Sequence, residues 1–260
     1  MLDINQIETF YPENLRPFKK NMLREYLQYK ILEILYRSEL GRGLVFMGGT
    51  AIRIVHANTR FSEDLDFDNR GLDKEQFEQL ARLMEKELAL EGYKVGTECV
   101  TKGAFRCYIK IYDLLYQTGI SAHRTEKLLI QLDAEPQGFE YRPQQIILNK
   151  FDVFTRINVV PVDILLSQKI CCIFTRKRPM GRDFYDIVFL MGKTAANLDY
   201  LDEKLHLKDA KELRDRLLKR CEAVDFKNLA DDVMSFVPNP KDAEKVLYFP
   251  DFIRQIMLAG

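Results

Sequence analysis

The sequence lacks an excess of charge of either sign. Its 260 residues include 39 Lys and Arg and 39 Asp and Glu, which gives a formal net charge of zero. A neutral protein has no overall electrostatic attraction for nucleic acid, so an anionic partner must be bound by a local basic patch. Hydrophobic residues make up 47% of the chain, which is enough for a buried core and argues against global disorder.

Histidine is scarce, and the cysteines are poorly spaced for zinc. There are three histidines, and no two of the five cysteines stand in Cys-x-x-Cys spacing, so a zinc site is not expected. The odd number of cysteines, together with a polar and acidic N-terminus unlike a secretory signal, predicts reduced thiols and a cytoplasmic location. The chain has no apolar run as long as a membrane span, so no membrane partner is expected.

The periodicity of the apolar residues changes near residue 160. Before it, helical spacing predicts helices at about 17–38, 50–56 and 73–92, and short or alternating apolar segments predict strands at 44–47, 65–67, 93–100, 105–115, 127–135 and 152–160. After it, helices are predicted at 162–176, 182–193, 201–224, 226–237 and 250–258. We therefore predict an α+β fold, with a mixed sheet and flanking helices in a domain over 1–160 and an all-helical domain over 161–260.

Three carboxylates alternate with apolar residues in the stretch Phe46–Arg70, which reads FMGGTAIRIVHANTRFSEDLDFDNR. Because residues two apart on a strand point to one face, Asp64, Asp66 and Asp68 would project side by side, with neighbours about 6–7 Å apart. A row of carboxylates binds a hard divalent cation such as Mg²⁺, which prefers oxygen ligands. The alternative is a solvated strand face without a ligand.

The small residues Gly48, Gly49 and Thr50 favour the functional interpretation of this acidic row. A turn of small residues that enters a helix exposes backbone N–H groups, and these bind phosphate. Nucleotidyl transfer requires both parts, since one metal ion activates the attacking hydroxyl while another holds the triphosphate and the leaving pyrophosphate. The stretch therefore predicts metal-dependent nucleotidyl transfer.

The residues GGTAIRI and RFSEDLDFD resemble the AbiEii/AbiGii toxin family, within the superfamily of DNA-polymerase-β-like nucleotidyltransferases. The resemblance implies the nucleotidyltransferase fold and transfer of a nucleotide from an NTP, with Mg²⁺ or Mn²⁺ as cofactor and release of pyrophosphate. It also implies a toxin of a type IV toxin–antitoxin or phage-defence system, with an RNA acceptor such as a tRNA end and a cognate antitoxin as partner.

The family pattern assigns roles to individual residues around this stretch. Thr50 keeps the hydroxyl that acts on phosphate or metal in the family. Arg60 and Ser62 belong to the pattern as well, and we count both among the nucleotide-binding residues. Arg60 would pair with the acidic row or a phosphate, and Ser62 would cap the entry to the strand. The alternative is that both residues have purely structural roles.

In that superfamily a third carboxylate on a neighbouring strand completes the metal site. The best match is Asp133 in KLLIQLDAEP, because it ends an apolar strand at the corresponding stage of the fold. Asp113 in IKIYDLL is the alternative. Either residue would otherwise be an ordinary acid at the end of a strand.

A second cluster, PVDILLSQKICCIFTRKRPMGRDFYDIVFL, also resembles the family. The resemblance assigns Lys169 to neutralising the triphosphate, Arg176 and Arg182 to nucleotide binding, and Asp186 to supporting Lys169 or acting as a base. Lys169 falls near the edge of an apolar helix face, from which it would reach a pocket. Alternatively, Asp183 and Asp186 are ordinary acids near a helix N-terminus, where the helix dipole favours them, and the basic run is a solvated loop.

Two other functions use the same residues. A nucleotidyltransferase of the antibiotic-modifying kind would transfer to a small hydroxyl compound. A non-catalytic sensor would bind a nucleotide without transfer, although the intact pair of acids argues against it.

Overall fold

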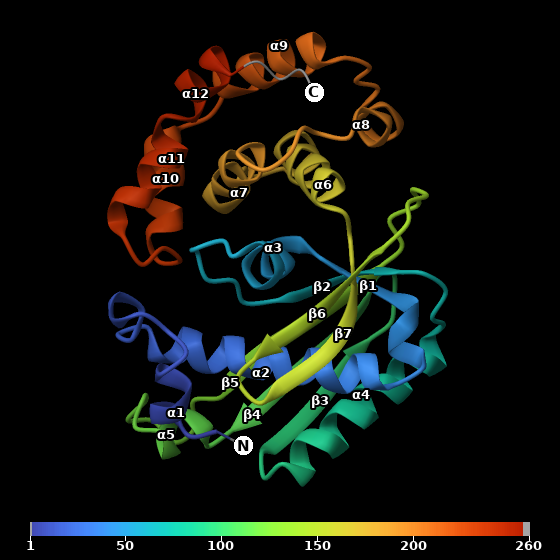
Figure 1. Ribbon diagram of the computed structural model, residues 1–260, viewed down its shortest axis with the longest axis vertical. Coiled ribbons are helices and arrows are strands. Elements are labelled where there is room, and N and C mark those ends of the chain that lie inside the picture. The colour runs from blue at the N-terminus through green and yellow to red at the C-terminus, as the bar shows by residue number, and fades with distance from the viewer. Residues whose placement is uncertain (1, 257–260) are drawn as a thin grey trace. The chain divides into compact units, whose positions relative to one another are not determined.

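The computed structural model describes residues 2–256. The chain divides into two compact units. Unit 1 consists of Met1–Ala57, Phe61–Gly138 and Pro143–Val159, and unit 2 consists of Asn58–Arg60, Phe139–Arg142 and Val160–Gly260. Unit 1 contains the sheet and unit 2 is helical, which confirms the predicted α+β fold class (Figure 1).

A seven-stranded mixed sheet forms the centre of unit 1. Its strands are β1 (Leu44–Met47), β2 (Leu65–Asn69), β3 (Lys94–Val100), β4 (Phe105–Tyr112), β5 (Leu128–Glu135), β6 (Gln144–Lys150) and β7 (Val153–Val159). Their order is β3-β4-β5-β2-β1-β7-β6, and only the pairs β2–β5 and β1–β7 are parallel. Strand β6 was not predicted, because Ile146, Ile147 and Leu148 are consecutive and break the alternation, and only Leu148 is buried.

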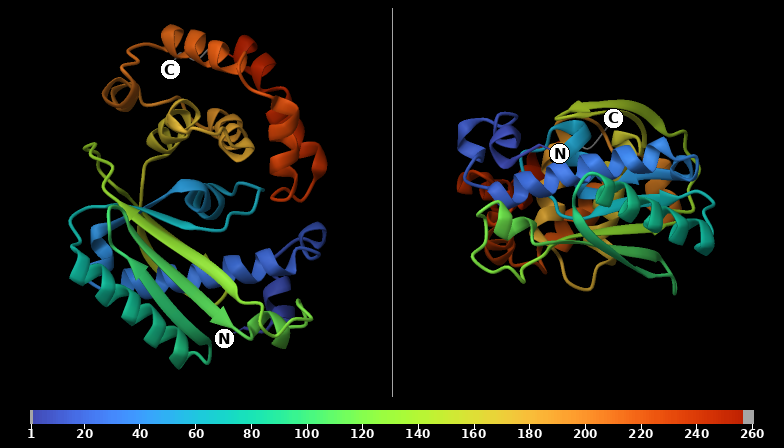
Figure 2. Two further views of the ribbon diagram at one scale, coloured as in Figure 1. Left: turned by 180° about the vertical axis from the view of Figure 1, so that it is seen from behind. Right: turned by 90° about the horizontal axis from the view of Figure 1, so that it is seen from below.

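Two long helices cover one face of this sheet. The helix α2 (Lys19–Arg37) packs against β7 and β5, α4 (Lys74–Leu90) packs against β3 and β4, and the two helices contact each other (Figures 1 and 2). The Asp73 carboxylate accepts from the backbone N–H of Gln76 at 2.8 Å, which confirms Asp73 as the N-cap of α4. The remaining helices of unit 1 are α1 (Ile4–Glu8), η1 (Glu13–Leu15), η2 (Leu40–Gly43), α3 (Gly48–His56) and α5 (Leu114–Gln117).

Helix α2 is buried on all sides, so its charged side chains need partners. The Glu25 carboxylate is 3% exposed and receives hydrogen bonds of 2.7 Å from Arg53 Nε and from Lys150 Nζ. Burial by itself raises the pKa of Glu25, but the charges of Arg53 and Lys150 outweigh it, so the pKa lies below its ordinary value. This buried ion cluster therefore holds α2 to α3 and to the end of β6.

Unit 2 is all-helical apart from its connecting segments. Its helices are α6 (Val162–Thr175), α7 (Gly181–Met191), α8 (Leu198–Leu205), α9 (Ala210–Cys221), α10 (Phe226–Met234), η3 (Pro240–Ala243), α11 (Glu244–Leu247) and α12 (Phe249–Gln255). The rings of Phe184, Phe226 and Phe249 pack with centroids 4.9–6.0 Å apart and form part of its core.

The prediction of one helix over 201–224 is wrong. His206 adopts a left-handed φ of 55° and ends α8, and Asp209 then caps α9 through the backbone N–H of Glu212 at 2.8 Å. The last predicted helix, 250–258, corresponds to α12, and its residues 257 and 258 lie outside the described range. Within residues 2–256, no helix combines the length and the apolar character needed to cross a bilayer.

Candidate functional site

The acidic row lies at the start of β2, in the middle of the sheet of unit 1. Leu65 and Phe67 are completely buried, as predicted, and point to the core. Asp66 therefore points to the opposite face, where it is half-buried, and Asp64 lies directly before the strand. Alternation along β2 positions these acids, because a strand sends successive side chains to opposite faces.

Asp66 lies next to Asp133 in the sheet. The antiparallel register pairs Asp66 with Met47 of β1, and the parallel register pairs it with Asp133 of β5. Neighbouring residues in register project to the same face, so the two carboxylates lie on one side of the sheet. The alternative Asp113 follows β4 in a left-handed conformation, seven residues beyond the in-register partner of Asp133 and thus roughly 20 Å along the strand.

Gly48 lets the backbone approach the Asp66 carboxylate. A Cβ atom at Gly48 would lie 2.1 Å from Asp66 Oδ2, and the φ of Gly48 is +77°. Both observations require glycine at this position. Gly48 and Gly49 are the first residues of α3, and the N-cap residue Met47 provides no side-chain cap. Because Met47 pairs with Asp66 in the sheet, the N-terminus of α3 lies beside Asp66.

The structure corrects the expected role of the Thr50 hydroxyl. Thr50 is completely buried, and its Oγ1 donates to the backbone carbonyl of Asp64. The hydroxyl thereby fixes α3 to the segment that leads into β2, and it is not exposed to a ligand. The neighbouring backbone carbonyl of Ser62 accepts a hydrogen bond from Gln28 Nε2 at 3.1 Å, so this segment is also held by α2.

Asp133 of β5 and Asp68 of the acidic row each have an arginine partner. Arg106 donates from Nε to Asp133 Oδ1 at 2.6 Å and from Nη2 to Asp133 Oδ2 at 3.4 Å, and these contacts raise the pKa of Arg106. Asp68 is 3% exposed and accepts from Arg70 Nε at 3.3 Å and from the backbone N–H of Gln137 at 2.9 Å. Asp68 thus ties β2 to the segment after β5.

The donor set fits a hard divalent cation in part. Asp64 and Asp66 offer carboxylate oxygens, which suit Mg²⁺ and Mn²⁺. Among residues 2–256, however, no group of three or more His, Cys, Asp and Glu side chains is gathered as a metal site requires. The predicted third ligand, Asp133, lies beside Asp66 in register but turns its carboxylate to Arg106 and Gln131.

A second cluster of charges lies entirely within unit 2. Lys169 of α6 contacts Asp183 and Asp186 of α7, each at 3.0 Å. Arg60 donates from Nε and Nη2 to the two oxygens of Asp186, each at 2.6 Å, and Arg176 lies 3.3 Å from Asp183. Arg60, Asp183 and Asp186 are at most 1% exposed. The cluster is therefore a buried ion network that joins α6, α7 and the segment Asn58–Arg60.

This network corrects two expectations from the sequence. Lys169 was expected at a helix edge reaching into a pocket, but it is buried and holds the two acids of α7. Arg60 was expected to pair with the acidic row or a phosphate, and the structure gives it Asp186 as a bidentate partner. The reason is that an uncompensated buried charge is too costly, so buried ions pair with each other.

The charges of the network also bear on the two roles predicted for Asp186. Burial by itself raises the pKa of Asp186, but Arg60 and Lys169 outweigh it, so the pKa lies below its ordinary value. For Lys169, burial lowers the pKa and the two aspartates raise it more, so the amine stays charged. A carboxylate with a lowered pKa is a weak base. Support of Lys169 is the role that the geometry favours.

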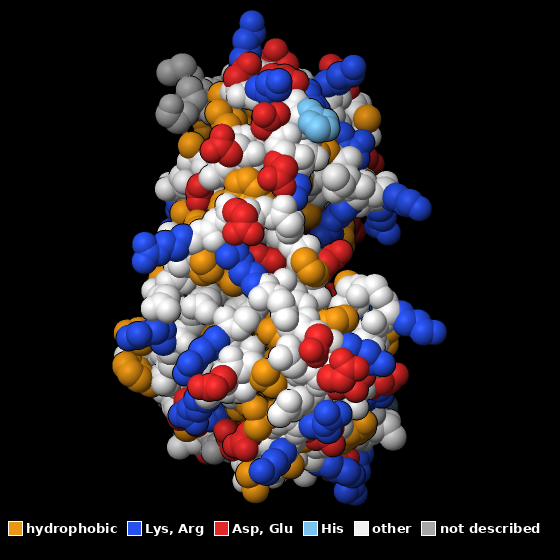
Figure 3. All heavy atoms as spheres, turned by 90° about the vertical axis from the view of Figure 1, so that its right-hand side faces the viewer, with side chains coloured by type: hydrophobic (Ala, Val, Ile, Leu, Met, Phe, Trp, Pro, Cys, Tyr) orange, Lys and Arg blue, Asp and Glu red, His pale blue; other side chains and the backbone are white. Residues whose placement is uncertain are grey.

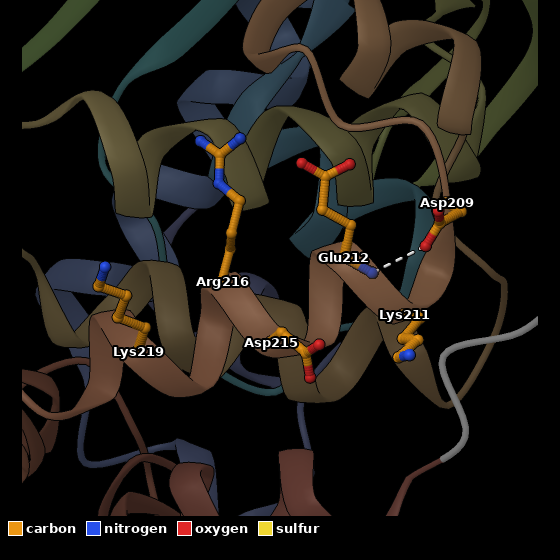
Figure 4. Close-up of a pocket in the computed structure, with 6 residues that line it drawn as sticks. All are labelled: Asp209, Lys211, Glu212, Asp215, Arg216 and Lys219. Atoms are coloured by element: carbon orange, nitrogen blue, oxygen red, sulfur yellow. Dashed lines mark hydrogen bonds between the residues drawn. The ribbon is translucent and has the colours of Figure 1, made fainter.

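Arg182 does not take part in the contacts that Lys169 makes. It lines a cavity of about 240 Å³ in unit 2. The residues lining this cavity are Arg178, Met180, Gly181, Arg182, Asp232 and Phe236. A second cavity, about 350 Å³, lies along α9 and is lined by both acidic and basic side chains, and Asp209 caps the N-terminus of the helix (Figure 4). On the face drawn in Figure 3, basic and acidic side chains are likewise interspersed, as expected for a neutral chain.

Sequence reasoning missed Arg106 and Asn58. Asn58 donates from Nδ2 to Asp186 Oδ1 at 3.0 Å, and Arg106 holds Asp133. Arg106 stands at an outward position of the alternating stretch FRCYIKIY, a pattern that predicts an open strand face. Its partner depends on the β4–β5 register, which the pattern leaves open.

Comparisons with known proteins agree with this fold. A family described as nucleotidyl transferase AbiEii toxin, type IV toxin–antitoxin system, matches residues 30–252. No curated protein matches the chain. JHP933 from Helicobacter pylori is 16% identical over 91% of this chain and 92% of that one, with a TM-score of 0.55. A candidate nucleotidyltransferase from H. pylori is 15% identical over 88% and 94%, with a TM-score of 0.51.

At these identities the two solved structures support the fold alone. The family match carries more, because it spans most of the chain and includes the glycine turn, the acidic row and the buried network of unit 2. The chain belongs to the AbiEii family of nucleotidyl transferase toxins of type IV toxin–antitoxin systems.

Proposed function

We propose that the protein transfers a nucleotide from an NTP to an acceptor and releases pyrophosphate. The observation that carries the proposal is the sheet register, which sets Asp66 between Met47, at the entry to the glycine turn, and Asp133 on the neighbouring strand. The glycine turn, which we propose to bind phosphate, and the carboxylates, which we propose to bind metal, are therefore neighbours within unit 1, and this supports nucleotidyl transfer.

In unit 1, different residues would bind the phosphates and the metal ion. The first backbone N–H groups of α3, from Gly48 onward, would bind phosphate oxygens, helped by the positive end of the helix dipole. Asp64 and Asp66, with Asp133 as the third ligand, would hold Mg²⁺ or Mn²⁺. When bound, such an ion neutralises phosphate charge and favours the deprotonated acceptor hydroxyl. The close packing of Gly48 against Asp66 would keep that carboxylate next to the N–H groups that we propose to bind phosphate.

We assign Lys169 and Asp186 a supporting role through the buried network. They hold the segment Asn58–Arg60, and this segment lies only four residues before Asp64 in the chain. Arg176 and Arg182 remain candidates for binding an anionic substrate, because they belong to the basic run of an otherwise neutral chain. Phosphoryl transfer depends mainly on positioning and charge. Disrupting the network that holds this segment should therefore reduce transfer.

The acceptor that we propose is RNA, such as the end of a tRNA, and the setting is a cytoplasmic toxin with a cognate antitoxin. Membership of the AbiEii family supports the toxin role. The run Arg176–Arg178 supports an anionic acceptor, because it places three cations in sequence, although Arg176 contacts Asp183 and Arg178 lies 3.8 Å from Asp232. All five cysteines are free, which agrees with a reducing compartment.

A transfer assay tests the proposal. The protein is incubated with each α-labelled NTP, Mg²⁺ and total cellular RNA, and the products are separated on a gel while pyrophosphate is measured. We expect label on RNA and an equal amount of pyrophosphate. Asp66→Asn should lower the rate at least about 100-fold without unfolding the protein, and Asp199→Asn on α8 is the matched control.

Each other outcome has a defined meaning. Label on a small hydroxyl compound but not on RNA would favour the antibiotic-modifying kind of enzyme. Binding of NTP without pyrophosphate release with any acceptor would favour the sensor. Wild-type turnover in Asp66→Asn would contradict the proposed role of the acidic row.

A further inference from the structure

Arg106 lies in the same row of the sheet as two of the proposed metal ligands. The register pairs Arg106 of β4 with Asp133 of β5, and Asp133 with Asp66 of β2. All three side chains therefore project to one face, in the order cation, acid, acid across three neighbouring strands. The cation thus stands directly beside the carboxylate that the proposed metal site needs as its third ligand.

Both oxygens of Asp133 are already used in the structure. Oδ1 accepts from Arg106 Nε at 2.6 Å, and Oδ2 accepts from Gln131 Nε2 at 2.8 Å and from Arg106 Nη2 at 3.4 Å. A divalent cation would compete with these donors for the lone pairs of the carboxylate. The same contacts agree with the finding that no group of three carboxylates is gathered as a metal site among residues 2–256.

The ion pair of Arg106 and Asp133 is exposed enough to separate. The Arg106 side chain is 42% exposed, so its guanidinium can turn into water at little cost. In the neighbouring pair of Arg70 and Asp68 both side chains are less exposed, at 28% and 4% against 42% and 25% for Arg106 and Asp133, and Asp68 also accepts from the backbone N–H of Gln137. Of the two pairs, Arg106 and Asp133 form the more exposed one.

We infer that Arg106 is an internal counter-ion that holds Asp133 out of the metal site until a divalent cation displaces it. Arg106 is thus a positioning residue that sets the affinity of the site for its cation. The inference rests on the proposed function, since it requires that Asp66 and Asp133 bind a metal ion. It differs from a purely structural role, in which the pair would only stabilise β4 against β5.

Binding of Mn²⁺ alone, without nucleotide, tests the inference. Free Mn²⁺ is followed by electron paramagnetic resonance during titration of the wild type, Arg106→Gln and the matched control Arg70→Gln. Removing an exposed competing ion pair should tighten binding about three- to tenfold in Arg106→Gln and leave Arg70→Gln unchanged. Arg106→Lys keeps the charge but loses the two-point contact, so we expect a smaller gain.

Two further variants separate the inference from the proposed function. In Arg106→Gln combined with Asp133→Asn the gain should disappear, because the released carboxylate is absent. Equal affinity in the wild type and Arg106→Gln, with Asp66→Asn still weakening binding, would overturn the inference and leave the metal site standing. Affinity that Asp66→Asn does not change would overturn the metal site, and the inference with it.

Discussion

At Gly48 the backbone packs directly against the Asp66 carboxylate of the acidic row. Its φ of +77° lies in the left-handed region, and the space that a side chain would need is filled by the Asp66 carboxylate. The glycine therefore serves the site twice, since it permits the turn into α3 and leaves room for the acid. A single methyl group at this position tests both requirements.

We expect Gly48→Ala to lower the free energy of unfolding by about 2–4 kcal/mol, because strain and a clash with Asp66 add together. Gly71→Ala is the matched control: its φ is +108°, but no atom lies within 4 Å of the added Cβ, so it should cost about 1–2 kcal/mol. Urea unfolding measures both. Equal losses would show that Asp66 moves aside and that the contact has no importance.

Lys169→Ala should destabilise the protein by about 3–5 kcal/mol, because it leaves Asp183 and Asp186 with too little positive charge in a buried place. This outcome would agree with the structural role found here. Lys211→Ala, at an exposed position of α9, should change stability by less than about 0.5 kcal/mol. A stable Lys169→Ala protein with weakened NTP use would instead restore the role that the sequence suggested.

Among the helices of unit 2, α7 and α10 approach each other at a glycine. A Cβ atom at Gly181 would lie 1.9 Å from the backbone carbonyl oxygen of Leu229, which cannot rotate away as a side chain would. The contact matters for the network, because Asp183 and Asp186 follow within two turns of the same helix. Helix packing at this point thus sets where the two acids lie.

Gly181→Ala should force α7 from α10 and lower the free energy of unfolding by about 1–3 kcal/mol. The matched control is Gly192→Ala at the other end of α7, where the nearest atom would lie 3.4 Å away. Thermal unfolding followed by circular dichroism compares the two. A Gly181→Ala protein as stable as the control would show that the helices separate without cost.

Each of the two units contains a buried carboxylate with a lowered pKa. These are Glu25 in unit 1, with an ordinary pKa of 4.5, and Asp186 in unit 2, with an ordinary pKa of 3.8. Since the unfolded chain binds these protons more readily, both groups stabilise the fold above their ordinary pKa values. That stability is lost as the pH falls toward the folded values.

We therefore expect the free energy of unfolding to fall below about pH 4.5, by about 1.4 kcal/mol per pH unit for each proton taken up. Urea unfolding at pH 7, 5, 4 and 3 measures the slope. Glu25→Gln and Asp186→Asn should be less stable at pH 7 and show a shallower slope in acid. A slope unchanged in both variants would show that other carboxylates cause the loss.

Much of the fold could be predicted from local patterns. The alternation of Leu65 and Phe67 with acids identified β2, and the Asp73 cap identified the start of α4. The pattern failed where a local signal was weak, as in the edge strand β6, or where a turn interrupted a continuous periodicity, as at His206. Backbone conformation at a single residue leaves no trace in hydrophobic spacing.

The candidate site divides in the same way. Local order along the chain was enough to identify the glycine turn and the pair Asp64 and Asp66, because both depend on a few consecutive residues. The partners of Asp133, Lys169 and Arg60 depend on strand register and helix packing between segments far apart in the chain. A charge becomes a metal ligand, a counter-ion or a buried support according to its neighbours in space, and those neighbours exist only once the chain is folded.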